Sequence, residues 1–154
     1  MGAMLQKQLL HMWVKWLLLL NLACALFMTG LIWFVQLVHY PLFGRVGAQN
    51  FVAYERAHQR LTTWVTAPVM LFEAALSIAL VCIQPSSRGT WLALALTLLV
   101  WASTMLVQVP LHAALAQGFE SASLARLVAS NWIRTIIWSG RSILLLWLIG
   151  KTHG

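Results

Sequence analysis

The chain has 154 residues, of which 61% are hydrophobic and only 8% charged, and its net charge is +7. A soluble domain is typically about 25% charged, and a chain this short leaves much of its surface exposed, so composition excludes a water-soluble globular domain. The basic residues are scattered and form no patch, which excludes a nucleic-acid-binding protein. We therefore expect one integral membrane domain covering residues 1–154.

Four apolar segments are long enough to cross a bilayer, which takes about 20 residues of helix. They cover about residues 16–38, 61–83, 91–109 and 133–149. The run from Gln84 to Gly89 contains proline, serine and glycine and predicts a tight turn, whereas residues 41–60 and 117–130 predict longer connections. The first segment is too long for a cleaved signal peptide. The predicted fold is all-α, a transmembrane up-and-down four-helix bundle.

Four spans place both termini on one side of the membrane. The basic residues divide almost evenly between Lys7, Lys15, Arg88 and Lys151 on the terminal side and Arg45, Arg56, Arg60 and Arg126 on the other. The positive-inside rule is therefore nearly tied. We expect a multi-pass protein of the bacterial inner membrane with both termini cytoplasmic. The positive net charge favours anionic lipids as partners, and homo-oligomers are compatible with the sequence.

Polar side chains are costly inside a membrane and usually face a bundle interior or a functional cavity. Residues three or four apart share one face of a helix, and each segment carries one polar stripe on this spacing. In an up-and-down bundle the stripes bring several polar residues together at the end away from both termini. These are His39, His58, His112, Asn131 and Arg134. We predict a polar pocket there, and solvated side chains for His11 and His153 near the termini.

Two further patterns concern the interior. Glu73 and Arg141 lie at comparable depth, which is compatible with a buried ion pair. The pairs Val35-Gln36 and Val107-Gln108 each precede a histidine, which indicates two helix hairpins related as a parallel repeat.

The second half of the chain resembles a known family. The matching residues are Val109-Pro110-Leu111-His112, Leu115-Ala116, Asn131, Arg134 and Thr135. They resemble the anthrone oxygenase-like family (DUF1772) of small four-helix membrane proteins, in which Val-Pro-Leu-Asn is followed by Trp-Asn-His-x-Arg-Thr. This sequence has His112 where the family commonly has Asn, and Trp132 where it commonly has His. The run Val38-His39-Tyr40-Pro41-Leu42 resembles the end of the family's first helix more loosely.

The resemblance implies a first hypothesis, a membrane oxidoreductase acting on an apolar, aromatic or polyketide-like small molecule. A histidine is a suitable general base, and Arg134 with Asn131 or Gln108 is suited to stabilise an enolate or phenolate. The candidate catalytic residues are His39, His58, His112, Arg134 and Asn131. The candidate substrate-binding residues are Gln108, Trp64, Trp132, Trp138 and Glu73. This chemistry needs no cofactor in principle.

A second hypothesis is a metal or haem site, because helix bundles build such sites from facing side chains. His39, His58 and His112 are the candidate ligands for copper, zinc or iron, and two of them on different helices suit axial haem ligation. Glu55 and His58 have the Glu-x-x-His spacing of di-iron bundles, but the motif occurs once. A third hypothesis is a non-catalytic assembly subunit or small carrier. The sequence leaves the cofactor, the substrate and the oligomeric state open.

Overall fold

The computed structural model describes residues 2–152, which form four long helical segments without a strand. The first consists of α1 (Gly2–Phe34), the π-helix η1 (Val35–His39) and α2 (Tyr40–Phe43), and the second is α3 (Ala48–Ile83). The third consists of α4 (Arg88–Ser103), the π-helix η2 (Thr104–Gln108) and α5 (Val109–Leu115), and the fourth is α6 (Ser121–Lys151).

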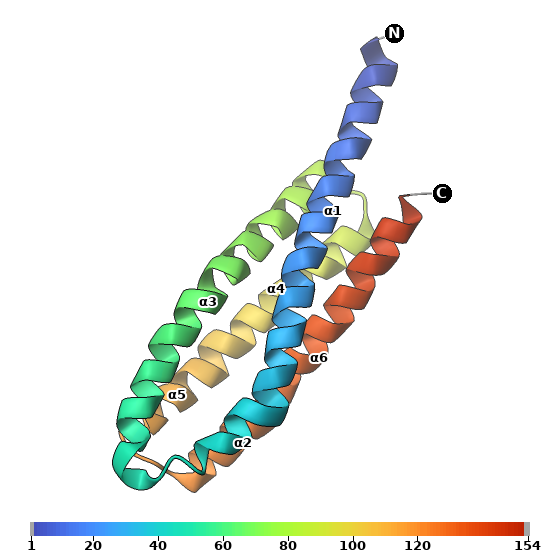
Figure 1. Ribbon diagram of the computed structural model, residues 1–154. Coiled ribbons are helices and arrows are strands. Elements are labelled where there is room, and N and C mark those ends of the chain that lie inside the picture. The colour runs from blue at the N-terminus through green and yellow to red at the C-terminus, as the bar shows by residue number, and fades with distance from the viewer. Residues whose placement is uncertain (1, 153–154) are drawn as a thin grey trace.

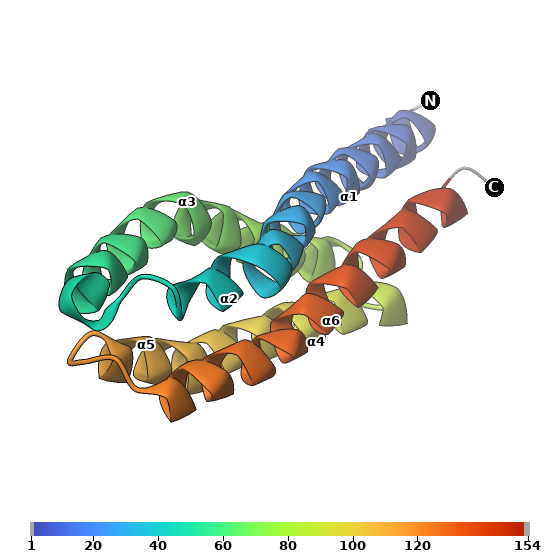
Figure 2. The same cartoon turned by 60° about the horizontal axis from the view of Figure 1, so that its bottom comes forward.

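The segments run up and down, so both ends of the chain lie at the same end of the bundle (Figure 1). Each segment packs against its neighbours in sequence, and α6 closes the ring against α1 (Figure 2). All four segments are long and apolar enough to cross a membrane. The predicted four-helix bundle is confirmed, and the chain is a multi-pass integral membrane protein.

The helices extend beyond the predicted spans. The first continuous segment able to cross a membrane covers Met4–Phe43 and the third covers Arg88–Leu115, against predictions of 16–38 and 91–109. The connections predicted over 41–60 and 117–130 shrink to 44–47 and 116–120, because α3 begins at Ala48 and α6 at Ser121. Hydropathy detects only the part of a helix that lies in hydrocarbon, about 20 residues. Polar flanks continue the helix without contributing to that signal.

The tight turn predicted after the second span is confirmed between α3 and α4. Ser87 caps α4 by accepting a hydrogen bond from the Thr90 amide at 3.4 Å. A side chain in place of Gly89 would collide with Leu148 of α6, so glycine permits the close approach of these two helices.

Each π-helix ends two residues before a proline: η1 ends at His39 before Pro41, and η2 ends at Gln108 before Pro110. The residue before each proline donates its amide to a carbonyl five residues back: Tyr40 to Val35, and Val109 to Thr104. A proline ring clashes with the carbonyl four residues before it in an ordinary helix, and the wider π turn moves that carbonyl aside. Single π turns are frequent at functional sites, and each of these two contains a buried glutamine, Gln36 or Gln108.

Arg141 ties all four helical segments together near the middle of the bundle and is fully buried. It forms an ion pair with Glu73 of α3. It also donates to Asn21 of α1 at 2.6 Å, to Ser77 of α3 at 2.8 Å and to Thr97 of α4 at 2.9 Å. The predicted Glu73–Arg141 pair is therefore present, with most of its polar atoms satisfied by hydrogen bonds. Hydrocarbon offers no water to replace these partners.

We expect Glu73→Gln to destabilise the bundle, because it leaves the Arg141 guanidinium buried without a counter-charge. Breaking a buried ion pair from one side typically costs about 3–5 kcal/mol. The double variant Glu73→Leu with Arg141→Met should lose less, because it leaves no charge unpaired. Reversible unfolding in detergent–lipid micelles measures both variants. A single variant no less stable than the double variant would contradict a structural role for the pair.

Candidate functional site

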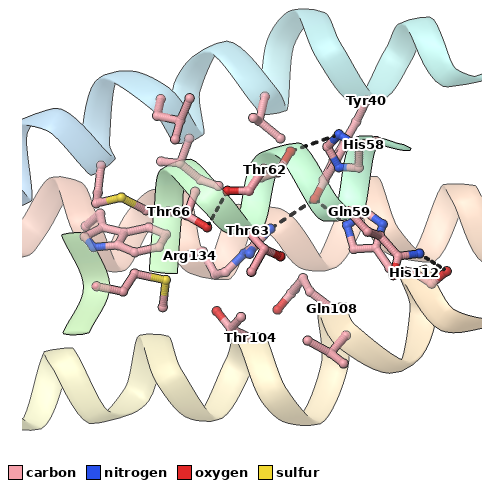
Figure 3. A pocket seen from close by; sticks show the side chains of 17 residues that line it. Tyr40, His58, Gln59, Thr62, Thr63, Thr66, Thr104, Gln108, His112 and Arg134 are labelled. Atoms are coloured by element: carbon pink, nitrogen blue, oxygen red, sulfur yellow. Dashed lines mark hydrogen bonds between the residues drawn. The ribbon is translucent and has the colours of Figure 1, made fainter. Parts of the chain in front are cut away.

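A cavity of about 120 Å³ lies inside the bundle at the end away from the termini, as the polar stripes predict. Its polar lining includes Tyr40, His58, Gln108, His112 and Arg134, which come from all four helical segments (Figure 3). The remaining lining is mostly apolar. An apolar cavity of about 150 Å³ is known to hold benzene, so this one accommodates a group of roughly one aromatic ring or less.

A chain of three side chains leads to the cavity wall. The Nδ1 atom of His112 lies 2.6 Å from Oε1 of Glu55, a carboxylate that is fully buried. The Nε2 atom of the same ring lies 2.9 Å from the hydroxyl of Tyr40. Gln59 holds this arrangement by donating to Glu55 at 3.1 Å and to the backbone oxygen of His112 at 2.9 Å. The carboxylate fixes the ring orientation, so Nε2 is free to exchange a proton with the phenol.

Arg134 completes the wall on the other side of Tyr40. Its Nη2 donates to the Tyr40 hydroxyl at 3.2 Å, and the same nitrogen donates to Asn131 Oδ1 at 2.5 Å. Within residues 2–152 it forms no ion pair, and its Nη1 makes no hydrogen bond. Arg134 is only 9% exposed and lines the cavity, and its Nη1 is an N–H donor without a hydrogen-bond acceptor among the described residues.

Two amides at the π turns hold the arginine side of the site in place. Gln36 of η1 accepts from Asn131 at 2.8 Å and donates to the Val128 carbonyl at 3.2 Å. Gln108 of η2 donates to Ser130 at 3.2 Å. Each π turn thus orients a glutamine that fixes α6, the helix that carries Arg134.

The other two histidines extend the polar region toward the lipid. His39 Nε2 and His58 Nδ1 lie 2.9 Å apart, and Thr62 Oγ1 lies 3.1 Å from the same His58 nitrogen. The rings of His58 and His112 are 5.2 Å apart. His58 lines the cavity, and within the described residues its Nε2 atom makes no hydrogen bond. The predicted convergence of His39, His58, His112 and Arg134 at one end of the bundle is therefore observed.

The structure divides the sequence-predicted residues into three groups. The cavity is lined by His58, His112, Arg134, Gln108 and Trp138. Three others do not line the cavity but form a hydrogen bond with a residue that does. These pairs are His39 with His58, Asn131 with Arg134, and Glu73 with Trp138 at 3.2 Å.

Trp64 and Trp132 lie outside the cavity. Trp64 is 76% exposed on the outer face of α3, and Trp132 packs edge-on against Trp33 at 5.5 Å between ring centroids. Each stands two residues from a cavity residue, Thr62 or Arg134, which is about 200° around a helix. The cavity lining therefore gives no support to the expectation that these two indoles stack on a substrate, which stays a prediction.

Tyr40 and Gln59 are not among the sequence-predicted site residues, and Glu55 appears there only through its Glu-x-x-His spacing with His58. Glu55 could have been found from the sequence, because the chain has only three acidic residues and an acidic residue beside a membrane span usually has a polar partner. Tyr40 gives little signal, because a tyrosine near the end of a span is ordinary at a membrane boundary. At the other end of the bundle, exposed His11 contacts the Thr152 carbonyl at 3.1 Å, and His153 lies outside the described residues.

The fit of a metal or haem can be tested on the same geometry. Within residues 2–152 no three His, Cys, Asp or Glu side chains are grouped to hold a metal ion. His39 and His58 bond to one another, and both ring nitrogens of His112 are engaged by Glu55 and Tyr40. A cavity of about 120 Å³ is also too small for a haem macrocycle. The arrangement suits proton transfer and oxyanion binding instead.

We expect His112→Ala to destabilise the protein, because it leaves the Glu55 carboxylate with Gln59 as its only partner. Leaving a buried polar group without its hydrogen bond costs about 1–3 kcal/mol. His112→Asn should cost less, since its amide keeps a donor near Glu55. Thermal unfolding in lipid bicelles compares both with His11→Ala, the exposed control at the other end. Equal stability for His112→Ala and His11→Ala would contradict this role.

No protein-family model, curated protein or solved structure matches this chain. The resemblance to the anthrone oxygenase-like family therefore stays a prediction. The features of this chain that bear on function are the cavity and the Glu55–His112–Tyr40–Arg134 arrangement.

Proposed function

We propose that the cavity is the active site of a membrane enzyme that removes a proton from an apolar, oxygen-bearing carbon acid. The observation that carries the proposal is the position of the Tyr40 hydroxyl, held between His112 Nε2 at 2.9 Å and Arg134 Nη2 at 3.2 Å. The phenol thus has a proton acceptor on one side and a cation on the other. That combination is typical of general acid–base catalysis with oxyanion stabilisation.

The unbonded Nη1 of Arg134 is the group that receives the substrate oxygen in this proposal. As the carbon loses its proton, negative charge develops on that oxygen, and a preorganised cation in a dry site stabilises it strongly. The guanidinium has no carboxylate partner to lose, because its other contacts are the neutral Tyr40 and Asn131. No carboxylate among the described residues therefore competes with the enolate for the positive charge of Arg134.

Tyr40, His112 and Glu55 carry the proton. His112 Nε2 accepts from the Tyr40 hydroxyl, and the phenolate oxygen then accepts the proton of the substrate carbon. The carboxylate of Glu55 stabilises the imidazolium that forms. Return of the proton from His112 through Tyr40 reprotonates the product or leads to proton release.

The substrate class follows from size and lining. Met28, Ile32, Met70 and Trp138 offer an apolar, aromatic-compatible wall, and the volume of about 120 Å³ holds roughly one ring. A larger polycyclic substrate extends out of the cavity toward the bilayer. The family resemblance points to dioxygen as the oxidant: an anthrone methylene loses two hydrogens and gains one oxygen atom, and the second oxygen leaves as water.

Tyr40→Phe tests this proposal with anthrone, a tricyclic ketone whose methylene hydrogens are acidic. The protein in bicelles made in deuterated water should accelerate deuterium incorporation into that methylene, measured by mass spectrometry under anaerobic conditions. Loss of one positioned proton-transfer group typically lowers the rate about 10²–10⁴-fold, so Tyr40→Phe should fall by that order. Arg134→Gln should fall about 10²–10³-fold.

Trp132→Phe is the matched control, because its ring lies outside the cavity and its exchange rate should equal that of the unmodified protein. Admission of air should then convert the exchanging anthrone to the quinone. If the unmodified protein and Tyr40→Phe exchange deuterium at the same rate for anthrone and for smaller cyclic ketones, the proposal is wrong.

We also propose that the protein lies in a bacterial inner membrane with both termini in the cytoplasm, an orientation that the nearly even division of basic residues permits. Single cysteines test the orientation in a background with Cys24→Ala and Cys82→Ala. A membrane-impermeant maleimide added outside spheroplasts should label Gln117→Cys, at the end with the cavity, and not Ser86→Cys, at the terminal end. The reverse pattern would invert the proposed orientation.

A further inference from the structure

A second, larger hollow lies on the outer face of α3, where the bundle meets lipid. This groove measures about 730 Å³ and is lined by residues of α3 alone: Arg56, Gln59, Arg60, Thr63, Trp64, Ala67, Pro68 and Leu71. The end of the groove near Arg56 and Arg60 is basic, and the end near Ala67 and Leu71 is apolar. Trp64 and Leu71 are 76% and 59% exposed there.

The two arginines lie one helical turn apart and their charges are uncompensated. Arg56 donates a single long hydrogen bond of 3.5 Å to the Ala116 carbonyl. Arg60 makes no hydrogen bond or ion pair within the described residues. Two exposed cations side by side attract an anion, and near a membrane surface each is worth a severalfold preference for anionic lipid.

The dimensions match one leaflet of a bilayer. From Arg60 to Leu71 the helix rises by about 16 Å at 1.5 Å per residue, and half of the hydrocarbon core measures about 15 Å. An acyl chain lying along Trp64, Ala67 and Leu71 therefore reaches the middle of the membrane when its headgroup contacts Arg56 and Arg60.

We propose that this groove is a binding site for one anionic phospholipid, with its phosphate at Arg56 and Arg60 and an acyl chain along the apolar part. A second copy of the chain packed through the same face would place its Arg56 and Arg60 against these two arginines. Because no acidic residue lines the groove, the like charges would repel, which disfavours a dimer through this face. The lipid also covers the inner cavity from the side, because Gln59 and Thr63 line both hollows. This site does not depend on the reaction proposed for the cavity.

Native mass spectrometry tests the site on protein ejected from nanodiscs that contain equal amounts of phosphatidylglycerol and phosphatidylcholine with identical chains. The unmodified protein should retain one phosphatidylglycerol in preference to phosphatidylcholine. Removing one arginine should lower that preference about 5-fold, and Arg56→Gln with Arg60→Gln should lower it about 30-fold. Arg56→Lys with Arg60→Lys should preserve most of it.

Matched controls separate the groove from general surface charge. Arg45→Gln removes an exposed cation from the same end of the bundle and should leave retention unchanged. Ala67→Trp fills the groove without altering charge and should abolish the retained lipid, whereas Leu98→Trp, on the lipid-facing side of α4, should not. Equal retention of the two lipids would overturn the proposal. So would a dimer without bound lipid that Ala67→Trp converts to a monomer.

Discussion

The hydrogen bonds and ion pair of Arg141 hold the bundle in its observed arrangement. One guanidinium on α6 reaches α1, α3 and α4 at once, through Asn21, Glu73 and Thr97. In hydrocarbon, apolar helix faces gain little by leaving lipid for one another, so polar contacts and close packing decide which helices associate and in what register. A shift of any one helix along its axis would separate it from this shared donor. The same register brings Tyr40, Glu55, His112 and Arg134 together toward the far end of the bundle.

The two proline-linked π turns interrupt the regular α-helix of the first and third segments. Each widens a helix just where the cavity lies and places a glutamine against α6. The two glutamines are not at equivalent positions: Gln36 is the second residue of η1 and Gln108 the last residue of η2. The residue before each proline also differs, Tyr40 in the first segment and Val109 in the third. The expected relation between the two helix hairpins therefore stays a prediction.

The sequence predicts the architecture well because four apolar runs and the periodic spacing of polar residues follow directly from the cost of exposing polar groups to lipid. That reasoning identifies His58, His112, Gln108 and Arg134 as residues that meet inside. It predicts helix ends poorly, because water-exposed flanks remain helical without apolar character. It does not fix the direction of Trp64, since an indole on a polar-bearing helix can point to the cavity or away from it, and a shift of two residues reverses the direction.

The sequence predicts the Glu73–Arg141 pair from depth but leaves the partner of Glu55 undetermined. That Glu55 contacts His112 depends on helix rotation, which a linear pattern does not show. For the same reason Tyr40 emerges as part of the site only when its hydroxyl is seen between a ring nitrogen and a guanidinium.

Glu55 and Arg134 form a split ion pair, with His112 and Tyr40 inserted between the two charges. Opposite charges held apart in a medium of low dielectric constant create a strong local electric field. This field acts along the line from Arg134 to Glu55, where the Tyr40 hydroxyl and the His112 ring lie. A polar molecule in the cavity is therefore oriented by the field, with its negative end toward Arg134.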